Sequence, residues 1–262
     1  MHSRSSASAQ RIDWAGLVIA SLCFVLIVGF YLLRSRDRAG YYAFVREDSV
    51  AETIQALCCL ASSVVAALAS RRLLRVRQKF LAALFALFAL GTFALFGEEI
   101  SWGQRLFGWQ TGDYFKATNM QEETNLHNDA RLKNVVHPIG IAVGIYAVMS
   151  AFLHVSFVRR GAKTLSYFTT EWPVMGFFAV FTAVYAIYEY LNPAIRPWYG
   201  FDLVLWQDLE MAETFFTAGI LGWTVLKLRS VERMFGACAE PRNVGASAAK
   251  PPAAAMLPAV NG

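Results

Sequence analysis

Two adjacent carboxylates, Glu98 and Glu99, follow directly after the apolar run KFLAALFALFALGTFALF. Carboxylates can act as general bases, as proton donors or as ligands of a divalent metal. At the carboxyl end of a helix the dipole disfavours them, so helix capping does not account for them. The alternatives are an ordinary polar boundary, where a helix leaves lipid, and a site at the membrane face. We expect Glu98 and Glu99 to act as catalytic groups of such a site.

Helical spacing would add further groups to this pair. If the helix continues beyond Glu98, then Ser101, Trp102 and Arg105 follow at i+3, i+4 and i+7 on the same face. Such a stripe would offer an acid, a hydroxyl, an aromatic wall and a cation. We therefore expect Trp102 and Arg105 to bind substrate.

The segment NMQEETNLHN carries a second candidate pair, Glu123 and His127, which are four residues apart. On a helix they would align at a spacing that a divalent metal can use, so such a metal is the candidate cofactor. His127 could also be a second catalytic base, or it could simply cap or hold its own loop. The sequence does not decide between these alternatives.

Polar residues also stand at the ends of other apolar runs. They are Asp48, Glu52, His137, Glu189, Asp208, Glu210 and Glu213. Acids at helix N-termini complement the dipole, which is an alternative explanation for most of them. Glu213 should lie one to two turns inside the apolar layer, so we expect it to be catalytic. An ionisable group costs about 2.5–3.5 kcal/mol at mid-bilayer on insertion scales and is commonly functional.

Composition places these residues in a membrane protein. Of the 262 residues 56% are hydrophobic and only 16% are charged, and the mean hydropathy is +0.39. A soluble domain has about 25% charged residues. The net charge of +5 is spread between apolar runs, which excludes a nucleic-acid-binding tract. The motifs HExxH, GxSxG, CxxC and GxxxxGK[ST] do not occur.

Six apolar stretches are long enough to cross a bilayer as helices. They are residues 14–34, 49–70, 80–97, 135–158, 173–191 and 207–227. The sequence therefore predicts an all-α polytopic membrane helical bundle over residues 1–235, with an outer loop at 98–134. Residues 236–262 lack apolar periodicity, and we expect them to form a disordered cytoplasmic tail.

The distribution of basic residues predicts the orientation. With both termini in the cytoplasm, 15 of the 24 Lys and Arg residues lie inside, and 15 of the 19 acidic residues lie outside. The first outer loop, with four arginines, disagrees, but three strongly basic connections outweigh it. This topology predicts a multi-pass protein of the inner (plasma) membrane. It also brings all the polar helix ends to the outer, periplasm-facing side.

The segments EDSVAE, GEEISWGQRLFGW and QEETNLHN resemble a group of uncharacterised bacterial multi-span membrane proteins that carry EDxxxE, EEISWGQR and ETNLHN motifs. The resemblance covers roughly residues 47 to 137. It implies the same polytopic fold and no activity. It also adds weight to a set of residues in these motifs: Glu98, Glu99, Gln104, Arg105, Glu123, Asn125 and His127.

Three classes of function fit these observations. The first is a membrane enzyme acting on a lipid or lipid-linked substrate, in which carboxylates and His127 do acid–base or metal chemistry and Arg105 or Arg131 binds an anionic headgroup. Gln104 and Asn125 would also contact substrate. The second is a proton- or cation-coupled transporter that uses Glu213 and Glu189. The third is a non-catalytic scaffold whose outer loop binds a partner protein.

Overall fold

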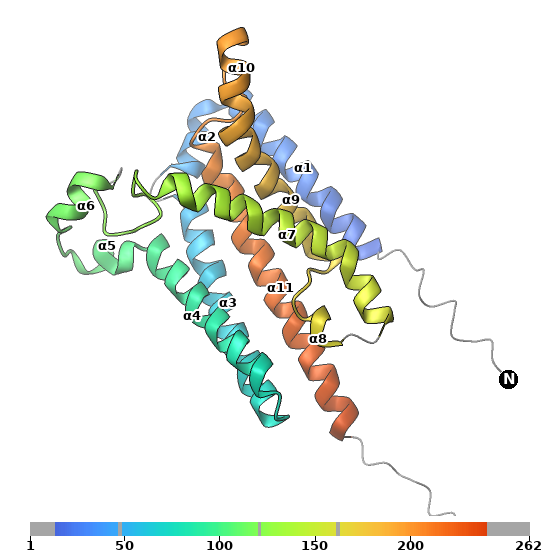
Figure 1. Ribbon diagram of the computed structural model, residues 1–262. Coiled ribbons are helices and arrows are strands. Elements are labelled where there is room, and N and C mark those ends of the chain that lie inside the picture. The colour runs from blue at the N-terminus through green and yellow to red at the C-terminus, as the bar shows by residue number, and fades with distance from the viewer. Residues whose placement is uncertain (1–13, 47–48, 120–121, 161–162, 240–262) are drawn as a thin grey trace, which may run out of the picture.

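The computed structural model describes residues 14–46, 49–119, 122–160 and 163–239 (Figure 1). Each of the six apolar runs forms a helix, and within the described residues there is no β-strand, so the all-α prediction is confirmed. The long helices are α1 (Trp14–Arg36), α3 (Val50–Arg75), α4 (Lys79–Glu99), α7 (Lys133–Arg159), α9 (Trp172–Ala186) and α11 (Asp208–Ala239). The short helical segments are α2 (Arg38–Val45), η1 (Ser101–Gly103), α5 (Gln104–Phe107), α6 (Asp113–Thr118), α8 (Lys163–Ser166), η2 (Ile187–Leu191) and α10 (Asn192–Tyr199).

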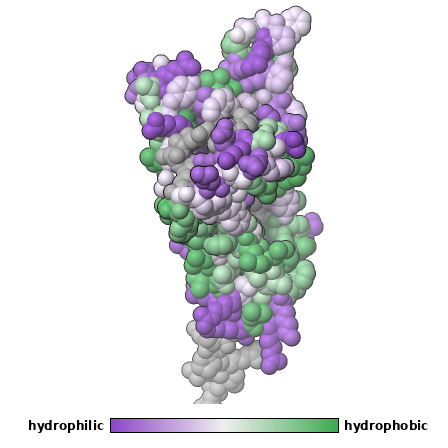
Figure 2. Space-filling view, turned by 90° about the vertical axis from the view of Figure 1, so that its left-hand side faces the viewer, coloured by the Kyte–Doolittle hydropathy of each residue, from purple (hydrophilic) through white to green (hydrophobic). Residues whose placement is uncertain are grey.

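Among the described residues, four helices are long and apolar enough to cross a membrane. They are Arg38–Arg75, which runs across the undescribed pair 47–48, Lys79–Glu99, Lys133–His154 and Trp172–Tyr199. Large apolar side chains such as Leu87, Leu90 and Met149 are more than half exposed on them, as expected of helices that face lipid. On the face that Figure 2 presents, hydrophobic residues gather in a band between two hydrophilic ends.

The ends of the long helices that carry the acidic residues meet at one end of the bundle, which we call the polar end. There α1, α4 and α9 finish, while α3, α7 and α11 begin. Contacts join these ends in pairs, because Arg34 of α1 binds Asp208 of α11 and Gln55 of α3 binds Glu210 of α11. These contacts bring Asp208 and Glu210 to the polar end, while the outer membrane face that the sequence assigns to them stays a prediction.

Helix α9 continues through η2 into α10 as one rod, and η2 is a π-helical turn. Pro193 explains this turn. Proline has no backbone N–H, so the carbonyl of Glu189 loses its usual partner, and the N–H of Asn192 bonds to the carbonyl of Ile187 instead. Turns of this kind widen a helix and are frequent at functional sites. Here the widened turn carries Glu189.

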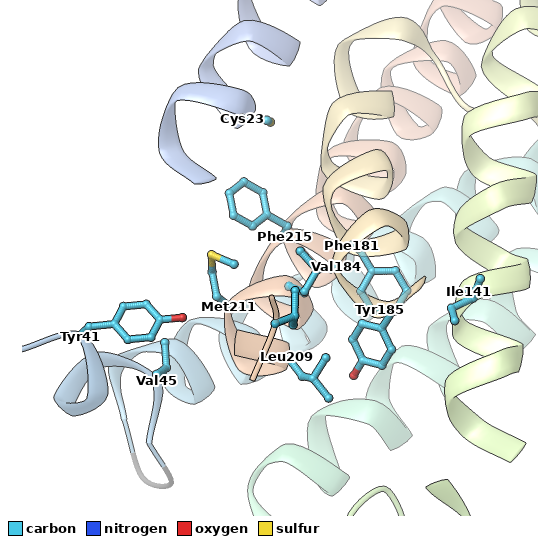
Figure 3. Close-up of a cluster of buried hydrophobic side chains, with 12 residues drawn as sticks. Cys23, Tyr41, Val45, Ile141, Phe181, Val184, Tyr185, Leu209, Met211 and Phe215 are labelled. Atoms are coloured by element: carbon cyan, nitrogen blue, oxygen red, sulfur yellow. The ribbon is translucent and has the colours of Figure 1, made fainter. Parts of the chain in front are cut away.

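Buried apolar side chains form a core beneath the polar end (Figure 3). It joins Tyr41 of α2, Phe181 and Tyr185 of α9, and Met211 and Phe215 of α11. At the opposite end of the bundle, Lys227 of α11 is buried and bonds to Glu171 at 2.7 Å and to the Ser166 carbonyl at 2.8 Å. These contacts fix α11 as the central helix, against which α3 and α9 pack.

Two local predictions were wrong. Helix α4 ends at Glu99, and the following residues Ser101 and Trp102 have positive φ, so the expected helical stripe from Glu98 to Arg105 does not form. The segment from Glu123 to His127 is a loop without helix, so their i, i+4 spacing does not align them. The last helix runs to Ala239, beyond the expected limit of 235. Asp48 lies outside the described residues, and so do residues 240–262 of the expected tail.

Candidate functional site

Glu98 joins the end of α4 to the outer loop. Its carboxylate accepts hydrogen bonds from the backbone N–H groups of Leu126 and His127 and from Nε1 of Trp102, the last at 2.8 Å. Backbone N–H groups of the loop thus supply the positive partners that the helix end cannot. Because these donors use both oxygens, Glu98 holds the loop in position, a role that the sequence did not indicate.

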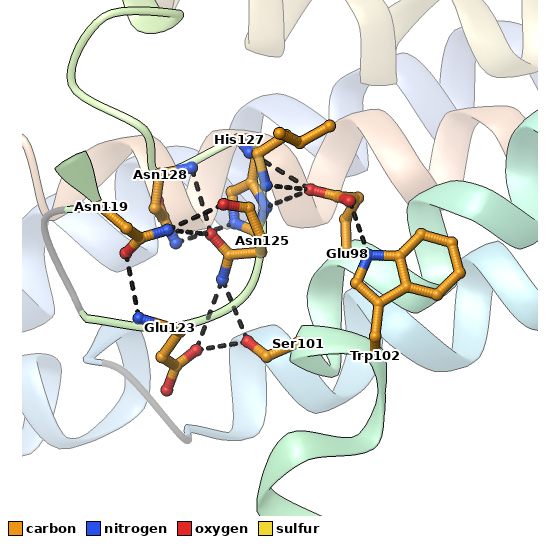
Figure 4. A network of polar contacts seen from close by, with 9 residues as sticks. Glu98, Ser101, Trp102, Asn119, Glu123, Asn125, His127 and Asn128 are labelled. Carbon is orange, nitrogen blue, oxygen red and sulfur yellow. Dashed lines mark hydrogen bonds and ion pairs between the residues drawn. The ribbon is translucent and has the colours of Figure 1, made fainter. Parts of the chain in front are cut away.

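A second layer of amide and hydroxyl contacts holds the same loop (Figure 4). Asn125 is buried, donates to Ser101 Oγ at 3.0 Å and accepts from Asn119 Nδ2 at 2.7 Å. Ser101 donates to Glu123. Gln104 accepts from the backbone N–H of Thr124 at 2.9 Å and so closes the other side of the loop. Glu123, Asn125 and Gln104 are therefore loop-forming residues, and none of them lines a cavity named below.

Trp102 turns back onto the helix that precedes it. A Cβ placed on Gly97 would lie 2.8 Å from the Trp102 ring, so this close approach needs a glycine at position 97. Ser101 and Trp102 reach it with φ of 47° and 54°, a region that residues with a side chain seldom occupy. Such strain persists only where neighbouring contacts fix it. The segment GEEISWG therefore forms a reverse turn, in which Trp102 lies against Gly97.

His127 lies among carboxylates from two helices. Its Nδ1 is 3.8 Å from Oε2 of Glu98, and its Nε2 is 3.0 Å from the Asn128 amide. Burial of the ring opposes the charged form, but the charges of Glu98, Glu99 and Glu213 outweigh this and raise the pKa of His127 to about 9. The ring is therefore an imidazolium at neutral pH, and four acidic residues, among them Glu210, favour this charged form.

A polar cavity of about 290 Å³ opens beside His127. Loop residues, the start of α7, the end of α9 and the start of α11 line it. Its lining residues are His127, Asn128, Lys133, Val136, His137, Tyr185, Tyr188, Trp206, Leu209, Glu210 and Glu213. The cavity therefore combines two imidazoles, two phenols, two carboxylates and an ammonium group within a small volume.

Around this cavity, two carboxylates each contact a ring side chain from another helix. The Tyr185 hydroxyl donates to Glu213 across the α9–α11 interface. His137 Nδ1 lies 2.5 Å from Oε1 of Glu189 on the π-helical turn, and the His137 ring meets the edge of Tyr185 at 5.1 Å between centroids. A carboxylate at Nδ1 fixes the orientation of an imidazole and leaves Nε2 for another partner. Glu189 thus fixes the orientation of the His137 ring.

Gln55 positions Glu210, the second carboxylate that lines the cavity. It is fully buried on α3, and its amide donates to the backbone carbonyl of Glu210 at 2.8 Å and to the Glu210 carboxylate at 3.3 Å. Glu52, one turn earlier on α3, acts electrostatically on Glu99. Helix α3 therefore acts on these acids from its own first turns.

Asp208 is separate from the cavity. It is buried at the start of α11, where it binds the Arg34 guanidinium and accepts from the Tyr41 hydroxyl at 2.5 Å and from the Leu205 N–H at 2.8 Å. These contacts make Asp208 a packing residue that joins α11 to α1 and α2. They also give a partner to Arg34, which the predicted topology counts in the first outer loop and the structure places in α1.

Arg131 and Glu123 do not line the cavity. Arg131 is exposed on the loop, and the side chain of Arg105 is outside the described part of the structure. Glu123 and His127 contact different partners, Ser101 and Glu98. Among the described residues, no group of three or more His, Cys, Asp or Glu side chains is arranged as a metal site. The geometry therefore does not add support to the predicted metal pair.

Sequence reasoning missed several lining residues. They are Asn128, Lys133, Tyr185, Tyr188 and Trp206. One signal was present, because Tyr185 stands four residues before Glu189 in YAIYEY and so shares its side of the helix. The others depend on how the loop returns to α7, which no spacing in the sequence reveals.

Comparison of the chain with models of protein families, with curated proteins and with solved structures gave no match. The assignment of function consequently depends on the chemistry of the cavity itself.

Proposed function

We propose that this chain is a multi-pass plasma-membrane enzyme that acts on a lipid or lipid-linked substrate by acid–base catalysis. In this proposal α1, α3, α4, α7, α9 and α11 all cross the bilayer, both termini are cytoplasmic, and the polar end faces outward. The fold supports it because the six apolar runs are helices whose polar ends share one end of the bundle.

The observation that carries the proposal is the cavity beside His127. It brings His127, His137, Glu210 and Glu213 to one space, in which the two imidazoles differ in their surroundings. His127 is held as a cation by several carboxylates, whereas Glu189 orients His137. A proton donor and a proton acceptor side by side are the requirement for general acid–base catalysis.

The roles follow from these surroundings. His137, oriented through Nδ1, is the candidate base, and His127 is the candidate acid. Lys133 lines the same cavity and supplies a positive charge for an anionic headgroup. Glu98 and Asp208 are assigned to positioning and packing, since protein donors already use their oxygens.

The depth of the cavity favours a lipid substrate. In this proposal the first turns of α7 and α11, the end of α9 and the adjoining loops, which line the cavity, lie at the level at which lipid headgroups meet hydrocarbon. A transport path is less well supported, because the aromatic side chains of Phe178 and Phe216 pack together directly beneath the cluster. An ion would have to cross this apolar layer.

The test is turnover of lipid headgroups. We expect purified protein in nanodiscs of phosphatidylethanolamine and phosphatidylglycerol, supplied with a total lipid extract, to deplete one lipid class over time by mass spectrometry. His137→Gln should abolish this depletion, and Glu122→Gln, on an exposed part of the loop, should not. A lipid composition that stays constant with the wild-type protein would contradict the enzyme proposal. Proton-driven uptake that Glu213→Gln abolishes would support transport instead.

A further inference from the structure

A second cavity lies below the polar end, within the apolar part of the bundle. It measures about 570 Å³ and lies between α4 and α7, with its floor on α9 and α11. Gly91 and Thr92 of α4, Val143 of α7 and Phe216 and Trp223 of α11 are among its lining residues. Helix α4 packs on α3 and α7 packs on α9, so the cavity is a cleft between two helix pairs. We call it the apolar cleft.

The wall of the apolar cleft presents almost only carbon. Three of its polar side chains already donate to backbone carbonyls of the protein. Thr92 bonds to Phe88 at 3.0 Å, Tyr146 bonds to Phe168, and Trp223 bonds to Thr169 at 3.1 Å. A ligand in this cleft would therefore meet no free donor or acceptor from these groups, and a hydrocarbon fits such a wall.

The cleft opens sideways at the depth of the membrane. Gly91 lies near the middle of Lys79–Glu99, and Val143 lies within Lys133–His154, both of which are long and apolar enough to cross a bilayer. At its rim Leu87 is 66% exposed and Tyr146 is 54% exposed, so the mouth is open. What surrounds this mouth in a membrane is lipid chains.

The cleft also adjoins the polar cavity. Phe216 of the cleft is three residues after Glu213 on α11, which is less than one helical turn. On α7, Val143 of the cleft is six residues after His137 of the cavity. The cleft and the cavity therefore follow one another along α7 and α11, an apolar compartment below a polar one.

We infer that the apolar cleft holds one hydrocarbon chain of a lipid whose headgroup lies in the polar cavity. This inference rests on the proposed function and narrows its substrate to a membrane amphiphile that enters sideways between α4 and α7. A chain that leaves the bilayer for the cleft exchanges one apolar surrounding for another, so the gain in affinity is small. Instead, the hydrocarbon chain in the cleft positions the lipid so that the bond linking its headgroup to the rest of the molecule lies at His127 and His137.

Photolabelling tests this assignment directly. The probe is phosphatidylglycerol with a diazirine at mid-chain, in vesicles of phosphatidylethanolamine and phosphatidylglycerol that contain the full-length protein. We expect adducts concentrated on the cleft segments of α4, α7 and α11. Even labelling of all apolar helices would overturn the inference, and so would cross-links from the cleft to a second copy of the chain.

Two glycines provide a matched pair of variants. A Cβ atom added at Gly91, in the cleft, or at Gly29, on α1 outside it, would meet nothing within 4 Å. Gly91→Leu should lower the cleft adducts about tenfold, the effect of overfilling an apolar site. Gly29→Leu should leave them unchanged. Equal labelling of the two variants would contradict the assignment of the cleft.

The two proposals fail separately in this design. The His137→Gln variant should lose turnover and keep the cleft adducts, because His137 lines the polar cavity and not the cleft. Cleft adducts without turnover in the wild-type protein would overturn the proposed enzyme activity and would still support a site for the lipid's hydrocarbon chain in the cleft. Turnover with even labelling would overturn the chain site alone.

Discussion

Glu98 and His127 stand 29 positions apart in the chain and form an ion pair, with Nδ1 3.8 Å from Oε2. The same carboxylate accepts the backbone N–H of His127, so the residue is held through both its main chain and its ring. One acid at the end of α4 thereby fixes a loop residue in the polar cavity. The stability and pH dependence of the protein should depend on this relationship.

Removal of the Glu98 carboxylate should loosen the loop. Glu98→Ala leaves the N–H groups of Leu126 and His127 and the indole of Trp102 without their acceptor. We expect a loss of about 2 kcal/mol in unfolding free energy, since hydrogen bonds to charged groups are the stronger ones. Thermal unfolding in detergent and proteolysis within the loop would measure it. Glu122→Ala should change neither, and equal effects of the two variants would refute this role.

Gly97 and Trp102 should be energetically coupled. Gly97→Ala puts a methyl group 2.8 Å from the indole ring and should destabilise by about 1–2 kcal/mol. In Trp102→Ala the ring is gone, so the further change Gly97→Ala should then cost little. A double-mutant cycle measures this difference. Additive effects would mean that the ring does not lie against Gly97. Gly91→Ala, which meets nothing within 4 Å, is the control.

Stability should fall as pH rises from neutral to alkaline. The pKa of His127 is about 9 in the folded protein, above the value of about 6.5 for an unfolded histidine, so the folded state binds this proton more tightly. Its contribution, about 3 kcal/mol, is complete below about pH 6.5 and is lost as pH rises through about 9. Glu98 and Glu99 on α4 and Glu210 and Glu213 on α11 produce the shift.

Unfolding midpoints of the wild-type protein and of His127→Gln, measured in detergent across this pH range, would test the point. The variant should lose the part of the slope that His127 contributes. Parallel curves for the two proteins would show that His127 is not the group responsible.

The Arg34–Asp208 pair should matter for folding and not for chemistry. Asp208 is almost completely buried, and Arg34→Ala would leave it without its cation. Breaking a buried pair from one side costs about 3–5 kcal/mol. Any lipid turnover, corrected for the folded fraction measured by circular dichroism, should be retained. A stable but inactive Arg34→Ala protein would place this pair in the catalytic site instead.

The helices could be predicted from the sequence, because long apolar runs have few alternatives in lipid. The run before Glu98 and the run after His137 illustrate this, since both are helices. The turn at Ser101 and Trp102 could not be predicted, because positive φ at these residues depends on contacts with the distant loop. An i, i+3 pattern in the sequence looks the same whether or not the helix continues.

The gathering of acids at one end was also predictable, since alternating helices must return their ends to the same place. The role of each individual acid could not be predicted. Asp208 and Glu98 are both acids at helix ends, yet Arg34 neutralises the first and loop N–H groups engage the second. Such partners are far away in sequence, and only the fold supplies them.

The most direct test of the account is the charge state of His127, observed by ¹⁵N NMR of the histidine-labelled protein in nanodiscs. The chain has four histidines, and His127→Gln identifies the signal. The account predicts an imidazolium that persists to about pH 8 and titrates near 9, well above an ordinary histidine. Titration of His127 near the ordinary value of about 6.5 would contradict it, because the carboxylates of α4 and α11 would then not surround the ring.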